Sequence, residues 1–152
     1  MTKAVFSHVN LIAEDWRQLS AFYQDVFGCE LVPPERDLSG PDLEAATGIA
    51  GAHIRGAHLR LPGIGADGPT LELFEYDESV APAVRAANSR GFAHVAFEVP
   101  DVEAELREVI AHGGSTLGEV VRKAIPGRGQ LAFVYVRDPE GNIIELSSWA
   151  SE

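Results

Sequence analysis

Residues 92–99, Phe-Ala-His-Val-Ala-Phe-Glu-Val, repeat a pattern that already occurs at residues 6–9, Phe-Ser-His-Val. His94 follows His8 by 86 residues, and the same offset relates three further pairs: Asp15 and Asp101, Gly28 and Gly114, Leu31 and Leu117. A second stretch, residues 68–73, matches residues 141–146 at an offset of 73. The first half therefore holds about 13 extra residues, and residues 33–51 accommodate them. Repetition of this kind indicates one structural motif present twice.

Each copy of the motif is predicted to form one strand, one helix and three further strands. The helices begin after Asp15 and Asp101, whose carboxylates suit an N-cap, and they end at Gly28 and Gly113. Apolar patterning predicts strands at 3–13, 29–32, 52–61 and 70–76, and again at 92–99, 119–125, 130–137 and 142–148. Residues 33–51 are predicted to form a loop with one helical turn at 42–47, of a length typical of a functional lid.

The predicted fold is α+β, with two βαβββ modules paired edge to edge into one curved, mostly antiparallel sheet and the helices on the outside. Neither module alone easily buries both faces of so small a sheet, so the two copies are expected to pair. We expect a single domain over residues 1–152. It comprises a first module at about 3–76, a linker at about 77–90 and a second module at about 91–149.

Composition excludes several classes of function. The formal net charge is −11, and the chain has no cluster of Lys and Arg that could neutralise phosphates, so a nucleic-acid partner is not expected. Cys29 is the only cysteine, and the apolar runs are too short to span a membrane. The first residues are a poor match to a signal peptide. We expect a cytoplasmic protein with a small-molecule substrate and no membrane partner.

Parity along the strands predicts which side chains share a face. Because Val5, Val9 and Leu11 are expected to meet the first helix, His8 faces the opposite side. The same reasoning places three more potential metal ligands on that side: Glu72, His94 and Glu145. The neighbours expected to line the cavity with them and to contact substrate are Phe6, Asn10, Phe74, Tyr76 and Phe92.

Two neutral imidazoles and two carboxylates carry a charge of −2, which balances a divalent cation. Such a mixed nitrogen and oxygen set suits Zn, Ni, Co, Mn or Fe(II) better than Mg or Ca. The remaining histidines are weaker candidates. His53 and His58 differ in parity, so at most one of them faces the cavity, and His112 lies at a helix end where a cationic side chain suits the dipole.

Four segments resemble the vicinal oxygen chelate superfamily: Phe-Ser-His-Val at 6–9, Leu-Glu-Leu-Phe-Glu-Tyr at 71–76, Ala-His-Val-Ala-Phe-Glu-Val at 93–99 and Asp-Pro-Glu-Gly-Asn-Ile-Ile-Glu-Leu at 138–146. That superfamily includes glyoxalase I, methylmalonyl-CoA epimerase, extradiol dioxygenases, fosfomycin-resistance enzymes and bleomycin-resistance proteins. The resemblance implies that His8, Glu72, His94 and Glu145 correspond to the glyoxalase I metal ligands. It also implies that Glu145 moves a substrate proton, with Glu72 as its counterpart, in a homodimer whose ligands come from one chain or from two.

The resemblance leaves three functions open. The first is a metal-dependent lyase or isomerase of the glyoxalase I or epimerase type, acting on a small oxygen-chelating substrate. The second is an Fe(II)-dependent extradiol-type dioxygenase that uses His8, His94 and Glu145 as a facial triad. The third is a drug-binding protein like those that confer bleomycin resistance, with an apolar cavity and a negative charge that attracts cationic ligands.

Overall fold

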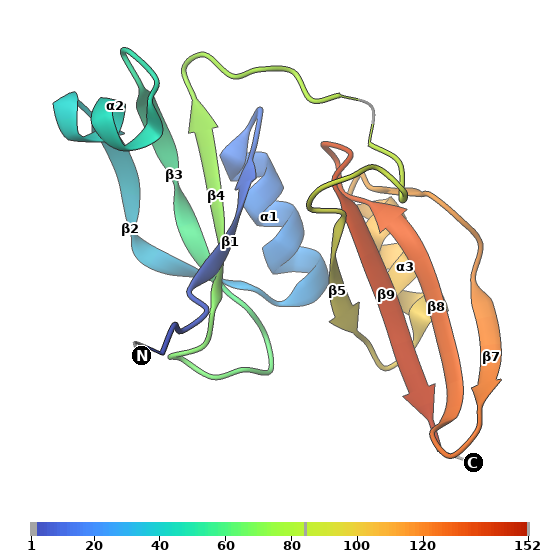
Figure 1. The fold of residues 1–152 in the computed structure, drawn as a ribbon. Helices are drawn as coiled ribbons and strands as arrows, with labels where there is room; N and C mark the ends of the chain where they lie inside the picture. The colour runs from blue at the N-terminus through green and yellow to red at the C-terminus, as the bar shows by residue number, and fades with distance from the viewer. Residues whose placement is uncertain (1–2, 84, 152) are drawn as a thin grey trace. The chain divides into compact units, whose positions relative to one another are not determined.

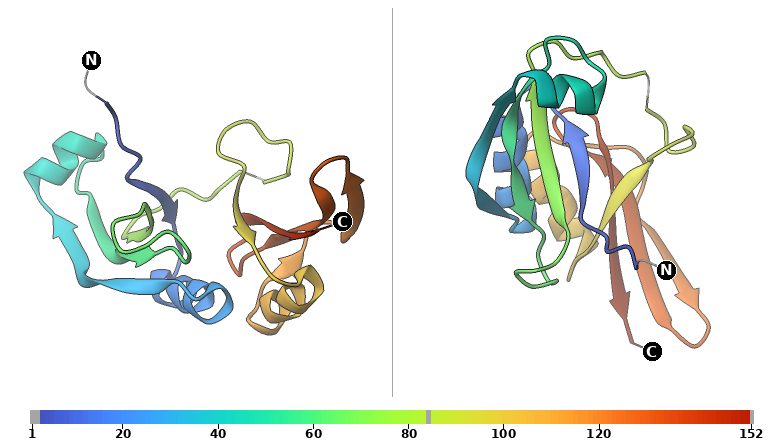
Figure 2. Two further views of the ribbon diagram at one scale, coloured as in Figure 1. Left: turned by 90° about the horizontal axis from the view of Figure 1, so that it is seen from below. Right: turned by 60° about the vertical axis from the view of Figure 1, so that its left-hand side comes forward.

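The computed structural model describes residues 3–83 and 85–151, and the chain divides into two compact units, Met1–Ala81 and Pro82–Glu152. Each unit contains one sheet with a helix against one face, which confirms the α+β class (Figures 1 and 2). The strands form two hydrogen-bonded sheets, one in each unit, where we expected the halves to continue as one sheet. In the part of the chain that the structure describes, no helix is long and apolar enough to cross a membrane.

The sheet of the first unit has the strand order β1-β4-β3-β2. Its strands are β1 (His8–Ile12), β2 (Glu30–Ser39), β3 (His53–Arg60) and β4 (Thr70–Tyr76). β1 runs parallel to β4, and the other neighbours are antiparallel. Helix α1 (Trp16–Phe27) contacts β2, β3 and β4 on one face, and the short helix α2 (Pro41–Thr47) follows β2. The opposite face of this sheet carries His8 and Glu72.

The sheet of the second unit has the order β5-β9-β8-β6, with β7 paired to β8 as well. Its strands are β5 (His94–Glu98), β6 (Ser115–Thr116), β7 (Val121–Ile125), β8 (Gly129–Arg137) and β9 (Ile143–Ala150). Helix α3 (Val102–Ala111) packs against β8 and β9. β5 is parallel to β9 as β1 is to β4, so the second unit repeats the plan of the first. β6, which the sequence analysis did not predict, and β7 both pair with β8, where the single strand β2 pairs with β3.

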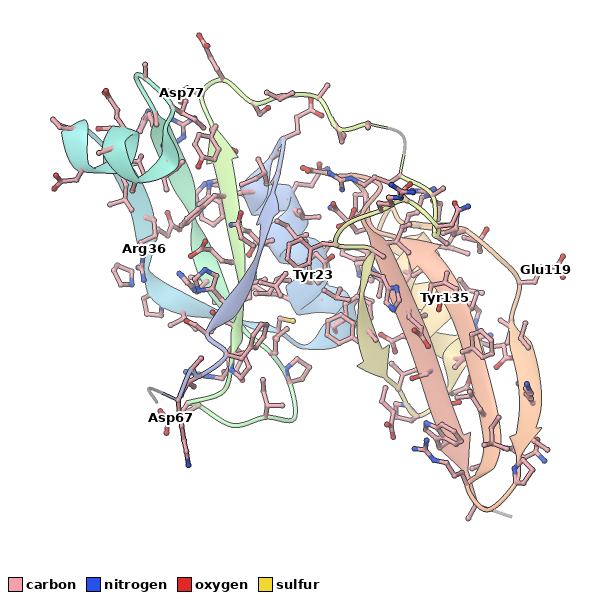
Figure 3. The ribbon with its side chains drawn as sticks, viewed as in Figure 1. Tyr23, Arg36, Asp67, Asp77, Glu119 and Tyr135 are labelled. Atoms are coloured by element: carbon pink, nitrogen blue, oxygen red, sulfur yellow. The ribbon has the colours of Figure 1, made fainter. Side chains whose placement is uncertain are left out.

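The helix boundaries follow from the signals in the sequence. Asp15 caps α1 by accepting the backbone N–H groups of Arg17 and Gln18, and Gly28 ends the helix with a left-handed φ of 67°. The buried side of α1 consists largely of aromatic side chains and packs on the sheet: Trp16, Leu19, Phe22, Tyr23 and Phe27. Tyr23 is fully buried (Figure 3). Asp101 caps α3 in the same way, through the N–H of Ala104.

The segment predicted as a loop at 33–51 is partly wrong. Its first residues continue β2 to Ser39, whereas the helical turn predicted at 42–47 is present as α2. A strand tolerates Pro33 and Pro34 here because the β2–β3 register shifts between Val32 and Arg36, so their missing N–H groups interrupt no ladder. The segment therefore is not a lid of irregular structure.

The first strands of both units begin later than predicted, at His8 and at His94. Val5 precedes β1 and is 87% exposed, so it does not pack against α1 as expected. Phe6 and Phe92 also precede their strands and are exposed. In α3, Ile110 is exposed because the buried position of the last turn is taken by Val109, one residue away on the helix.

Candidate functional site

The first half-site lies on the face of the first sheet opposite α1 and comprises His8, Asn10, His58, Thr70 and Glu72. Register brings them together: His8 pairs with Thr70, Asn10 pairs with Glu72, and His58 pairs with Glu72 from the other side. The predicted association of His8 with Glu72 is present, with His8 Nε2 3.7 Å from Glu72 Oε1. β4 therefore holds Glu72 between residues of β1 and β3.

Glu72 has a partner on each carboxylate oxygen. His58 Nε2 lies 2.7 Å from Oε2, and Asn10 Nδ2 donates to Oε1 at 3.1 Å and to the Glu72 backbone carbonyl at 3.2 Å. On its other nitrogen, His58 Nδ1 lies 2.8 Å from the hydroxyl of Thr70. The Glu72 side chain is only 12% exposed, so these polar contacts replace most of its hydration.

The second half-site comprises His94, Tyr135 and Glu145 and lies on the face of the second sheet opposite α3. His94 Nε2 is 3.1 Å from Glu145 Oε2. Tyr135, which extends from β8, pairs with Glu145 in the ladder, hydrogen bonds to its side chain and places its ring 5.2 Å from that of His94 (Figure 3). The second unit thus also holds one imidazole beside one carboxylate.

The two half-sites have the same strand register. His8 pairs with Thr70, and 73 residues after Thr70, Ile143 pairs with His94. Glu72 pairs with His58 on β3, and Glu145 pairs with Tyr135 on β8. The repeat detected in the sequence is therefore a repeat of backbone geometry, and His58 and Tyr135 occupy equivalent positions.

Burial is the main cause of the pKa shifts of the two equivalent residues, His58 and Tyr135. Desolvation lowers the pKa of His58, a shift that the nearby Glu72 carboxylate opposes and that Arg36 and His8 reinforce. Burial also raises the pKa of Tyr135, and the charge of Glu145 and the hydrogen bond to it act in the same direction. At neutral pH these shifts favour a neutral His58 imidazole and a protonated Tyr135 phenol.

Sequence reasoning missed Tyr135 and gave His58 only as a weaker candidate. For His58 the signal was ambiguous, because β3 carries buried residues of both parities, with Ile54 and Gly56 on one face and Ala57 and Leu59 on the other. Among the predicted contact residues, Phe74 and Tyr76 follow Glu72 at alternate positions on β4 and share its face. The ring of Phe74 lies 6.4 Å from that of His58.

The donors of the two half-sites fit a divalent transition metal in kind, since each unit offers one imidazole nitrogen and one carboxylate. Among residues 3–83 and 85–151, no group of three or more His, Cys, Asp or Glu side chains is arranged so that it could hold a metal ion. Neither half-site is therefore a complete metal centre by itself.

A separate charged cluster lies on the α1 side of the first sheet. His53 lies between Asp37 and Asp77, with Nε2 2.6 Å from Asp37 and Nδ1 2.7 Å from Asp77. Arg55 binds both Glu75 and Asp77. Asp77 lies just past the end of β4 (Figure 3). The hydrogen bonds to Asp37 and Asp77 raise the pKa of His53.

A cavity of about 430 Å³ adjoins this cluster, between the N-terminus of α1 and strand β2. Two of its arginines are bound to carboxylates that also line it, Arg17 to Glu35 at 2.7 Å and Arg55 to Glu75 at 3.0 Å. These ion pairs link α1 to β2 and β3 to β4.

The sequence matches the family model described as Glyoxalase/Bleomycin resistance protein/Dioxygenase superfamily over residues 5–146. The chain belongs to this superfamily. The superfamily match agrees with the repeated imidazole–carboxylate pair and extends over both modules. None of the curated proteins matches the sequence.

Solved structures of this superfamily share the fold at low sequence identity. A glyoxalase family protein from Bacillus cereus is 19% identical with a TM-score of 0.75, covering 99% of this chain and 96% of that one. A glyoxylase/bleomycin resistance protein/dioxygenase domain from Frankia sp. EAN1pec is 18% identical with a TM-score of 0.61, covering 98% and 100%. A glyoxalase family protein from Enterococcus faecalis is 22% identical with a TM-score of 0.59, covering 94% and 96%.

Proposed function

We propose that this superfamily member is a metal-dependent lyase or isomerase that acts on a small substrate with vicinal oxygen atoms. His8, Glu72, His94 and Glu145 would bind one divalent ion, with all four ligands from one chain or from two copies in a homodimer. The observation that supports the proposal is the recurrence of the same imidazole–carboxylate pair at the same register in both units.

The bound ion would polarise two substrate oxygens and so acidify the adjacent carbon–hydrogen bond. Glu145 is the base in this proposal. The Glu145 carboxylate takes the proton from the acidified substrate carbon and delivers the same proton to the adjacent substrate carbon, so no proton is gained or lost overall. Tyr135 donates a single hydrogen bond to the Glu145 side chain. Phe6, Asn10, Phe74, Tyr76 and Phe92 remain the proposed substrate contacts.

The proposal is tested on the full chain purified without added metal. Elemental analysis is expected to find roughly one divalent ion per chain, the stoichiometry of a single shared site. Activity is measured by NMR as solvent deuterium incorporation at the carbon next to the carbonyl, with a panel of α-hydroxy ketones and thiol adducts of α-oxo aldehydes. The Glu145→Gln variant should bind the ion more weakly and lose about 10²- to 10⁴-fold in rate, the usual contribution of a general base.

The matched control is Glu108→Gln, which changes an exposed glutamate on α3 in the same way. It should leave metal content and exchange unchanged. Full metal retention and an unchanged exchange rate in Glu145→Gln would remove the basis for the assignment, as would wild-type protein that binds no divalent ion.

A second candidate is an Fe(II)-dependent oxygenase. The observation that favours it is that His58 and Asn10 already engage one lone pair on each Glu72 oxygen. If these contacts hold Glu72 away from the ion and its other lone pairs stay unused, His8, His94 and Glu145 form a set of two histidines and one carboxylate with open positions for substrate and oxygen. Oxygen uptake with catechols that requires Fe(II) and survives Glu72→Gln would establish this alternative over the isomerase.

A further inference from the structure

We propose that His58 is a positioning residue for Glu72, and that it donates a hydrogen bond that keeps this carboxylate as a permanent metal ligand. The inference rests on the proposed function, because it assigns a role to a neighbour of one of the four proposed ligands. His58 comes from β3, a strand to which the sequence analysis assigned no metal ligand, and it reaches Glu72 through direct register pairing.

The contacts of His58 determine its tautomer. An ionised carboxylate accepts hydrogen bonds and donates none, so at 2.7 Å from Glu72 Oε2 the Nε2 atom of His58 must carry the proton. In the neutral imidazole Nδ1 is then an acceptor, and the Thr70 hydroxyl, 2.8 Å away, donates to it. The result is a directed chain from Thr70 through His58 to Glu72. Chains of this kind hold metal ligands in orientation.

The other oxygen of Glu72 is held by Asn10, which also donates to the Glu72 backbone carbonyl. One donor on each oxygen fixes the plane of the carboxylate while leaving a lone pair on each atom for a metal. His8 lies on the same side, 3.7 Å from Oε1. The first half-site thus holds its carboxylate still before any metal binds.

The second half-site has no side-chain donors at the positions equivalent to Asn10 and Thr70. Ala96 stands at the position equivalent to Asn10, and Ile143 at that of Thr70, and neither side chain can donate a hydrogen bond. Tyr135 takes the place of His58. The asymmetry assigns different tasks to the two carboxylates, because a carboxylate held on both oxygens suits a fixed ligand and one with fewer anchors can move a proton.

The test measures Co²⁺ binding by visible absorption in competition with a chelator, on the full chain, for the wild type, His58→Leu and His58→Gln. His58→Leu should weaken Co²⁺ binding by about 10- to 100-fold, as expected when a partner of a metal ligand is lost. His58→Gln can place an amide N–H near the position of Nε2, so it should restore most of the affinity. His112→Gln, at the end of α3, is the control for loss of a histidine and should bind as wild type does.

Thermal unfolding of the metal-free proteins separates positioning from folding, since a positioning role requires that His58→Leu is still folded at the temperature at which its Co²⁺ binding is weakened. If His58→Leu fails to fold, Thr70→Val decides the question, because it removes only the hydroxyl that orients the ring and should weaken Co²⁺ binding to a smaller extent. Unchanged Co²⁺ affinity in Thr70→Val would then overturn the inference.

Three further outcomes contradict the inference, and they are distinguishable. Wild-type affinity in His58→Leu overturns the role of His58 and leaves the proposed function intact. Equal losses in His58→Gln and His58→Leu overturn positioning by an N–H donor, because the imidazole itself would then be required. Wild-type protein that binds no Co²⁺ overturns the proposed function and this inference together.

Discussion

The two units share one backbone plan and differ in the residues that surround it. In both, a parallel pair of strands places a histidine beside a glutamate, and an antiparallel strand adds a third polar group opposite the glutamate. That group is His58 in the first unit and Tyr135 in the second. The comparison shows that both units keep the same register and therefore the same pairing of the proposed ligands. The residues around the two glutamates differ, so the two carboxylates have different hydrogen-bond partners.

The cores give the largest expected effect. Leu73 and Leu146 are equivalent in the repeat, and both are completely buried. Leu73→Ala and Leu146→Ala should each lower the free energy of unfolding by about 2–5 kcal/mol, measured by urea denaturation, through lost burial and a residual cavity. Leu38→Ala, at a position that is 45% exposed, is the control and should change it by less than about 0.5 kcal/mol. A loss confined to one of the two core variants would show that the units are not equivalent in packing.

The helix caps give an intermediate effect. Asp15→Ala and Asp101→Ala should each cost about 1 kcal/mol in free energy of unfolding, the usual value for an N-cap. The loss should be greater for Asp15, whose carboxylate accepts two backbone N–H bonds, than for Asp101, for which one is present. The matched Asn variants keep an acceptor and should lose little. The reverse order, measured by thermal and urea unfolding, would contradict the link between bond count and stability.

The smallest expected effect is a pH dependence of stability that arises in the first unit and has no counterpart at the equivalent position of the second. His53 is bound to Asp37 and Asp77, with Arg55 beside it, and its pKa is raised above the ordinary value of 6.5. Its stabilising contribution is therefore fully present below about pH 6.5 and is lost as pH rises through the higher pKa of the folded state. Gln130 occupies the equivalent position in the second unit and does not titrate.

Unfolding is therefore measured between pH 6 and 9 for the wild type and for His53→Gln. The wild type should lose a small amount of stability over this range, since the cluster is largely open to solvent, and the variant should lose less. Identical pH profiles for the two proteins would show that the contacts of His53 do not contribute to stability.

Much of the fold was predictable from local chemistry. α1 begins and ends where Asp15 and Gly28 indicated, and β4 has the predicted bounds, because caps and alternation act over a few residues. The association of His8 with Glu72 and of His94 with Glu145 also followed from parity and repetition. The convergence of all four ligands on one metal stays a prediction.

The amino-acid sequence by itself determined that one βαβββ motif occurs twice and which histidine and glutamate each copy presents, since both follow from periodicity and capping. Only the tertiary structure decided that β2 continues through Pro33 and Pro34 and that His58 meets Glu72. The physical reason is that both depend on register between strands distant in sequence. A proline is tolerated in a strand where the register with the partner strand requires no hydrogen bond from its nitrogen. Where the sequence of a strand is ambiguous, as in β3, the register with the partner strand decides which face carries the site.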